Sequence, residues 1–139
     1  MSFTYSRKIN YYETDMMGIV HHSNYIRYLE EARCALLETA KIPMSLIESK
    51  GYTIPTIEVN CKYKVPVTQG DIIAIGVKVT EYNGVRMRID YDVKNTKTGD
   101  TVIEAYTNHC FTNKKLKPVN MKKHDEDIDS KFMEMLNVE

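Results

Sequence analysis

Residues 23–40 read SNYIRYLEEARCALLETA, and this stretch decides the fold class because it carries a long helical pattern. Its apolar residues recur at spacings of three and four, which is typical of an amphipathic helix with a broad apolar face. The face consists of Ile26, Leu29, Ala32 or Arg33, Leu36, Leu37 and Ala40. Ser23 stands where a helix N-cap is expected. We therefore predict one long helix that covers a hydrophobic core.

The segments on either side of this helix contain signals for a strand and for a second helix. Residues 3–11 are rich in aromatic and β-forming residues and predict a first strand. Pro43 suits the first position of a short helix, MSLIES, and Gly51 suits the left-handed residue that often follows a helix. The long helix is thus expected between a strand and a short helix.

After Gly51 the apolar period changes to two, which indicates strands. Residues 57–65 alternate, and we expect the side with Ile57, Val59, Cys61, Tyr63 and Val65 to be buried. Further strands are predicted at 71–82, 85–95 and 101–112, with Asn83-Gly84 as a hairpin turn. An amphipathic segment with Ile128, Phe132 and Met135 follows.

The order of these elements is a strand, a long helix, a short helix and four more strands. It predicts an α+β fold in which an antiparallel sheet packs on one helix. We expect a single domain over residues 1–139, with a C-terminal extension from about residue 118, because the chain shows no internal repeat and no linker.

Composition excludes several classes of function. Lys plus Arg equals Asp plus Glu at 19 each, which argues against binding nucleic acid or a membrane through overall charge. No apolar run has signal-peptide character or reaches the ~20 residues that span a bilayer, so we expect a cytoplasmic protein without stable membrane insertion. The three cysteines, Cys34, Cys61 and Cys110, are far apart, and we expect reduced, mostly buried thiols.

Polar residues are concentrated just before the long helix, between Glu13 and Tyr25. A helix N-terminus presents unpaired N–H groups that can stabilise an oxyanion, and a nearby carboxylate such as Asp15 can act as nucleophile or general base. Taken alone, Asp15 is more typical of a solvated loop residue than of a catalyst, and His21 and His22 are typical of a surface loop. No ligand spacing indicates a metal, and no Gly-x-Ser-x-Gly motif or activated cysteine indicates another nucleophile.

Residues 11–33, YYETDMMGIVHHSNYIRYLEEAR, resemble the signature of the 4-hydroxybenzoyl-CoA thioesterase family, in particular its bacterial short-chain acyl-CoA and tol–pal-associated branch. Residues 59–79, VNCKYKVPVTQGDIIAIGVKV, are similar to the family's second strand and hairpin, and the likeness extends to about residue 117. The matching positions in the signature are Tyr11, Thr14, Asp15, Gly18, Val20, His22, Asn24, Tyr25, Ala32 and Arg33.

This resemblance implies a hotdog fold whose subunits join their sheets, as a dimer or a dimer of dimers, with active sites at the interface. It assigns the catalytic carboxylate to Asp15 and the N–H that polarises the thioester carbonyl to the backbone of His22, whose side chain helps to orient substrate or water. The implied substrate-binding residues are Tyr11, Gly18, Val20, Asn24 and Tyr25. Glu13, His21 and Met16-Met17 depart from the family pattern, which bears on acyl specificity.

The implied substrate is an acyl-CoA, whose phosphates call for a local cationic rim. The candidates are Lys62, Lys64, Arg86 and Arg88, although solvated strand faces explain these charges equally well. The expected activity is thioester hydrolysis without a metal or other cofactor, since coenzyme A is part of the substrate. Two alternatives are a hotdog hydratase or dehydratase and a non-catalytic acyl-CoA-binding protein.

Overall fold

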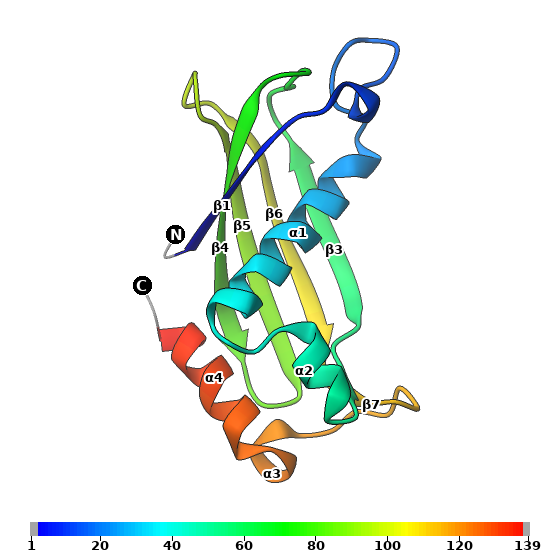
Figure 1. Cartoon of the computed structure of the whole chain (residues 1–139), viewed down its shortest axis with the longest axis vertical. Helices are drawn as coiled ribbons and strands as arrows, with labels where there is room; N and C mark the ends of the chain where they lie inside the picture. The colour runs from blue at the N-terminus through cyan, green and yellow to red at the C-terminus, as the bar shows by residue number, and fades with distance from the viewer. Residues whose placement is uncertain (1–2, 138–139) are drawn as a thin grey trace.

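The computed structural model describes residues 3–137, which fold around one antiparallel sheet (Figure 1). The elements, in chain order, are β1 (Phe3–Lys8), the 3-10 helix η1 (Tyr11–Glu13), α1 (Ser23–Thr39), α2 (Met44–Ser49), β2 (Tyr52–Thr53), β3 (Thr56–Tyr63), β4 (Ile72–Tyr82), β5 (Arg86–Asn95), β6 (Thr101–Cys110), β7 (Thr112–Asn113), α3 (Met121–His124) and α4 (Glu126–Asn137). The predicted α+β arrangement is confirmed.

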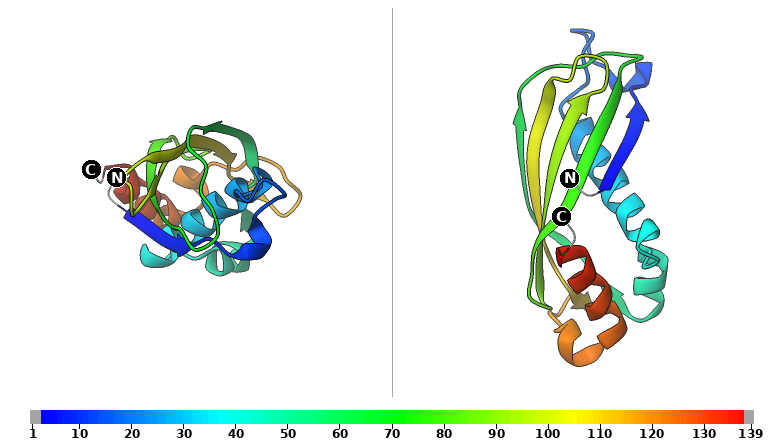
Figure 2. Two further views of the ribbon diagram at one scale, coloured as in Figure 1. Left: turned by 90° about the horizontal axis from the view of Figure 1, so that it is seen from above. Right: turned by 90° about the vertical axis from the view of Figure 1, so that its left-hand side faces the viewer.

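The main sheet has the strand order β1-β4-β5-β6-β3, and all neighbours are antiparallel. β4, β5 and β6 are joined by hairpins, and Gly84 in the first hairpin has φ +95°, as the predicted Asn-Gly turn requires. The sheet curves around α1, which crosses its concave face (Figure 2). β1 and β3 are therefore the two edge strands.

The core lies between α1 and the sheet, and α1 buries a slightly different face from the one predicted. Tyr25, Tyr28, Leu29, Ala32 and Leu37 are buried, whereas Ile26 is half exposed. The two tyrosines keep the helical spacing of the apolar residues, and their rings meet edge to face at 5.8 Å. The expected helix is correct, but its buried stripe is rotated toward the tyrosines.

The start of α1 corrects two further predictions. β1 ends at Lys8, and Tyr11 belongs to η1 instead of the first strand. Ser23 is already the first helical residue, and the residue before it, His22, makes no side-chain capping bond. Instead, Nδ1 of His21, which precedes the helix by two residues, accepts from the backbone N–H of Ser23 at 3.2 Å and so satisfies one of the free N–H groups at the helix start.

The predicted buried face of residues 57–65 is the clearest error. β3 forms as expected, but Ile57 and Tyr63 are each about half exposed and Val59 is also exposed. The reason is position in the sheet, because β3 is an edge strand whose apolar side extends beyond the cover of α1. The alternation thus predicted the strand correctly but not what covers it within one chain.

The C-terminal segment closes the end of the core that α1 leaves open. Ile128, Phe132 and Met135 of α4 are buried, as predicted, and the Phe132 ring packs on Phe111 at 5.0 Å. α4 contacts β4 at the opposite end of the sheet from η1 (Figure 1). All three cysteines are free, but only Cys110 is buried, so the expectation of mostly buried thiols is wrong.

Candidate active site

Asp15 lies at the base of a tight loop before α1. Its backbone N–H donates to Ile19 O at 2.8 Å, and Gly18, with φ +79°, returns the chain by donating to Asp15 O at 3.0 Å. Oδ1 of Asp15 accepts from the backbone N–H of Met17 at 2.8 Å. Oδ2 accepts no hydrogen bond within residues 3–137. One carboxylate oxygen is therefore fixed while the other is available to a proton or a carbonyl carbon.

Glu13 anchors this loop to the sheet. Its carboxylate accepts two hydrogen bonds from Arg7 on β1, at 2.8 and 2.9 Å, and one from the backbone of Asn10 at 2.8 Å. Burial raises the pKa of Glu13, but the hydrogen bonds from Arg7 and Asn10 outweigh it and the pKa is lowered. The carbonyl oxygen of Glu13 accepts from the side-chain amide of Asn24 at 2.8 Å. Strand, loop and helix are thus connected through one residue.

The start of α1 presents His22 beside the loop. Its backbone N–H donates to no acceptor in the described part of the chain, so it is open to a ligand. Its ring stacks on His21 with centroids 4.3 Å apart and meets Tyr63 edge-on at 6.4 Å. A helix N-terminus carries partial positive charge, so an oxyanion is favoured at this N–H.

A pocket of about 240 Å³ opens between the start of α1 and the end of β3. Its lining is mostly apolar, and burial raises the pKa of Tyr25, one of the lining residues, to about 12, so its hydroxyl stays neutral. The lining residues are Ile19, Val20, His22, Tyr25, Tyr63, Lys64, Val65, Pro66 and Val102. Asp15 does not line the pocket in the single chain but is hydrogen-bonded to Ile19, which does.

The residues predicted to bind substrate therefore fall into two groups. Val20 and Tyr25 line the pocket. Gly18 forms the turn, Asn24 is bonded to Glu13, and Tyr11 is exposed on η1, where its carbonyl oxygen accepts from Thr14 at 2.7 Å. The structure gives this second group roles in shaping the loop.

The four cationic candidates lie mostly away from this pocket. The register of β3, β5 and β6 places Lys62, Arg86 and Arg88 on the face of the sheet opposite α1. Arg88 stacks over Tyr106 at 3.9 Å and is paired with Asp90 at 3.0 Å. Of the four, only Lys64 also lines the His22 pocket, whereas Arg86 and Arg88 line one hollow on the outer face and Lys62 and Arg88 line another.

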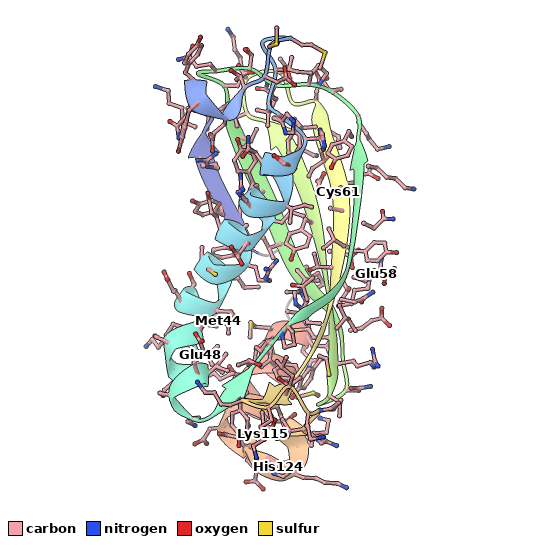
Figure 3. All side chains as sticks on the ribbon, turned by 90° about the vertical axis from the view of Figure 1, so that its right-hand side faces the viewer. Met44, Glu48, Glu58, Cys61, Lys115 and His124 are labelled. Atoms are coloured by element: carbon pink, nitrogen blue, oxygen red, sulfur yellow. The ribbon has the colours of Figure 1, made fainter. Side chains whose placement is uncertain are left out.

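Tyr63 is the site residue that sequence reasoning missed. The period of two placed it on the apolar side of its strand, where it was interpreted as core. Its position beside His22 depends on the sheet order, which puts the end of β3 next to the start of α1 (Figure 3, where Cys61 two residues earlier is labelled). No local pattern carries that information.

Two kinds of feature are absent from residues 3–137. They contain no group of three or more His, Cys, Asp or Glu side chains that could hold a metal ion. None of the helices in this part of the chain combines the length and the apolar character needed to span a membrane.

A long helix on the concave face of an antiparallel sheet is the architecture of the hotdog fold. The sequence model of the thioesterase-like superfamily matches residues 9–133, and the chain belongs to that superfamily. A putative esterase of Aquifex aeolicus is 36% identical over 80% of this chain and 85% of its own length. The putative acyl-CoA thioesterase YneP of Bacillus subtilis is 32% identical, over 84% of each chain.

Solved structures confirm the hotdog fold. The hypothetical protein AQ1494 of Aquifex aeolicus superposes with a TM-score of 0.86 at 31% identity, covering 94% of this chain and 98% of that one. A DHNA-CoA thioesterase of Staphylococcus aureus superposes with a TM-score of 0.89 at 22% identity, covering 94% and 88% of the two chains, which supports the fold alone.

Proposed function

We propose that this protein hydrolyses an acyl-CoA thioester, with Asp15 as the catalytic carboxylate and the His22 N–H as oxyanion donor. One observation carries the proposal: a single short segment contains both an oriented carboxylate with one unbonded oxygen and, at the start of α1, a backbone N–H without an acceptor. Membership of the thioesterase-like superfamily and a relative named as a putative acyl-CoA thioesterase support it.

Two routes fit this arrangement. In the first, Asp15 takes a proton from water, the hydroxide adds to the thioester carbon, and the negative oxygen is held by the His22 N–H. The C–S bond then breaks, and the CoA thiolate recovers the proton. In the second, Asp15 itself adds to the carbon and expels the thiolate, and water hydrolyses the resulting mixed anhydride. Both end with a free acid and CoA.

The site is proposed to be completed by a second copy of the chain. Within residues 3–137 no strand pairs with the outer edge of β3, and the apolar side of this strand is exposed. Exposed strand edges and apolar patches are rare in isolated soluble chains, and pairing of two β3 edges removes both. Lys62 lies on β3 itself, and Arg86 and Arg88 lie two strands away on the same outer face. We propose that these cations bind the CoA phosphates of a substrate held between the two chains.

The decisive experiment measures thiol release from a panel of acyl-CoAs by wild type and Asp15→Asn. The amide keeps the shape but removes nucleophilicity and basicity, so we expect kcat to fall at least ~100-fold with a smaller change in KM. Asp127→Asn is the matched control. Asp127 is an exposed residue of α4 at the other end of the molecule, and its variant should keep wild-type rates.

The alternative functions give different results in the same assay. Saturable binding of acyl-CoA without thiol release from any member of the panel would indicate a non-catalytic binding protein. Addition or loss of water in an enoyl or hydroxyacyl chain with the thioester intact would indicate a hydratase or dehydratase. Near wild-type turnover by Asp15→Asn would refute the assignment of Asp15.

A further inference from the structure

A chain of hydrogen bonds runs through the core between α1 and the sheet. Nη1 of Arg33 donates to the hydroxyl of Tyr91 at 3.2 Å. The hydroxyls of Tyr91 and Thr107 are 2.7 Å apart, and Thr107 Oγ1 is 2.7 Å from Nε2 of His109. Tyr91, Thr107 and His109 are all buried, so the four residues form one enclosed polar path.

Arg33 fixes the direction of this path. A guanidinium only donates hydrogen bonds, so the Tyr91 hydroxyl accepts one from Arg33 and donates its own hydrogen bond to Thr107. Thr107 then donates to Nε2 of His109, whose proton lies on Nδ1. Burial, and then the charge of Arg33, lower the pKa of His109 to about 4, so the imidazole is neutral. The path carries one positive charge, located on Arg33.

Within the described residues this charge has one ion-pair partner, the exposed carboxylate of Glu30. The side chain of Arg33 is 17% exposed, and that of Glu30, whose carboxylate is 3.7 Å away, is 68% exposed. Of the five N–H donors of a guanidinium, the described residues accept one hydrogen bond. An ion pair of this length to an exposed carboxylate contributes little stability, so the remaining N–H donors of Arg33 are available to a second anion.

A cavity of about 100 Å³ lies where such an anion would reach Arg33. Arg33 and His109 line it together with apolar walls that include Leu37, Ile89 and Phe132, and Glu30 is also at its boundary. Met44, another lining residue, is labelled in Figure 3. Apolar walls with a few placed polar groups are typical of a small-molecule site, and a cavity of this size has room only for the end of a larger molecule.

The cavity and the His22 pocket lie along the same face of the sheet. Tyr63 of the pocket and Cys61 share one side of β3, and Cys61 pairs with Ala105, which pairs with Tyr91. Tyr63 and Tyr91 are therefore about 7 Å apart along the strand direction, two residues of sheet. The pocket and the cavity share no lining residue, so an acyl group that reaches from one to the other has to extend beneath α1 toward Arg33.

We propose that the cavity receives the far end of the acyl group and that Arg33 selects acyl groups ending in a second carboxylate. The fork of a guanidinium matches the two oxygens of a carboxylate, which a plain alkyl end does not offer. This inference rests on the proposed function and narrows its substrate to the CoA monothioester of a dicarboxylic acid. Arg33 acts here as a specificity residue.

The test compares two acyl-CoAs of equal chain length, one with a terminal carboxylate and one with a terminal methyl group, over several medium chain lengths. For wild type we expect kcat/KM to favour the carboxylate by about tenfold or more at the best length, the size of a charge-assisted hydrogen bond. Arg33→Met should bring this ratio close to one. Glu30→Gln, which removes the competing acid at the mouth, should raise it.

Binding of the matching non-hydrolysable thioethers, measured by calorimetry on wild type and Glu30→Gln, keeps the test valid if Arg33→Met does not fold. If the thioether with the terminal carboxylate binds more tightly than the one with the methyl end, but neither thioester is turned over, hydrolysis is refuted and the selection by Arg33 is supported. Turnover with a ratio near one at every length, or a ratio that Arg33→Met leaves unchanged, would refute the selection and leave hydrolysis standing.

Discussion

At the scale of single residues, the loop that carries the candidate carboxylate Asp15 is held to β1 by the hydrogen bonds between Glu13 and Arg7. Asp15 and His22 could be selected because a carboxylate and a helix start occur within one short segment. The anchoring of that segment through Glu13 and Arg7 could not be predicted, because it depends on how β1 meets the loop in space. Glu13 looked like a departure from the family pattern and turns out to carry structural hydrogen bonds.

His22→Ala should reduce kcat less than Asp15→Asn does, because the proposed contribution of residue 22 is a backbone N–H that alanine keeps. Steady-state kinetics with the best acyl-CoA measures the difference, and His21→Ala, which removes the stacked neighbour, serves as the comparison. A loss as complete as that of Asp15→Asn would make the imidazole an obligatory acid or base.

His109 should remain neutral in the folded protein down to a pH near 4, because burial and Arg33 lower its pKa to about 4. The unfolded chain binds this proton at the ordinary pKa of about 6.5, so it binds more protons between these values. The free energy of unfolding should therefore fall as pH drops from about 6.5 to about 4, by at most about 3 kcal/mol from this residue.

Imidazole NMR titration measures the pKa of His109 directly. Denaturant unfolding at several pH values, compared between wild type and His109→Gln, isolates its share of the acid sensitivity. An ordinary pKa for His109, or equal acid sensitivity of the two proteins, would contradict the prediction.

At the scale of elements, periodicity predicted which segments are helices and strands but not what covers them. The alternation in β3 was correct for a strand, yet its apolar side is exposed because sheet order makes β3 an edge. In α4 the spacing predicted both the helix and its buried side correctly, because that side packs on Phe111 and β4 of the same chain. The difference lies in long-range topology, which a local pattern does not contain.

Phe132→Ala should destabilise the fold by about 3–5 kcal/mol, because the ring is fully buried between Tyr82 and Phe111 and its loss leaves a cavity. Chemical denaturation of the variant and wild type gives this difference. Glu134→Ala, on the exposed side of α4, should change stability by less than about 0.5 kcal/mol. Equal effects of the two changes would show that α4 does not pack as described.

At the scale of the whole molecule, we expect a stable homodimer or a dimer of dimers, with no populated monomer at micromolar concentration. The outer edge of β3 has unpaired backbone groups in a single chain, and a second copy is a partner with matching geometry. Analytical ultracentrifugation at the assay concentration should show a multiple of 16.1 kDa.

Val59→Lys adds a charge to the exposed apolar side of β3 and should shift the assembly toward monomer with loss of activity. Lys97→Glu, in the exposed turn between β5 and β6, is the charge-change control. A wild-type monomer that hydrolyses acyl-CoA at full rate would refute both the interface and the shared site.

The tip of the Asp15 loop has a consequence for how this protein can diversify. Met16 and Met17 are exposed, and the loop is closed through backbone groups, with Met17 contributing only its N–H. Residues other than proline can therefore replace Met17 without breaking the bond to Asp15, and Met16 is free of packing constraints. A library randomised at these two positions should therefore consist largely of folded proteins, and thiol-release assays on it would measure how far the loop tip influences the proposed substrate preference.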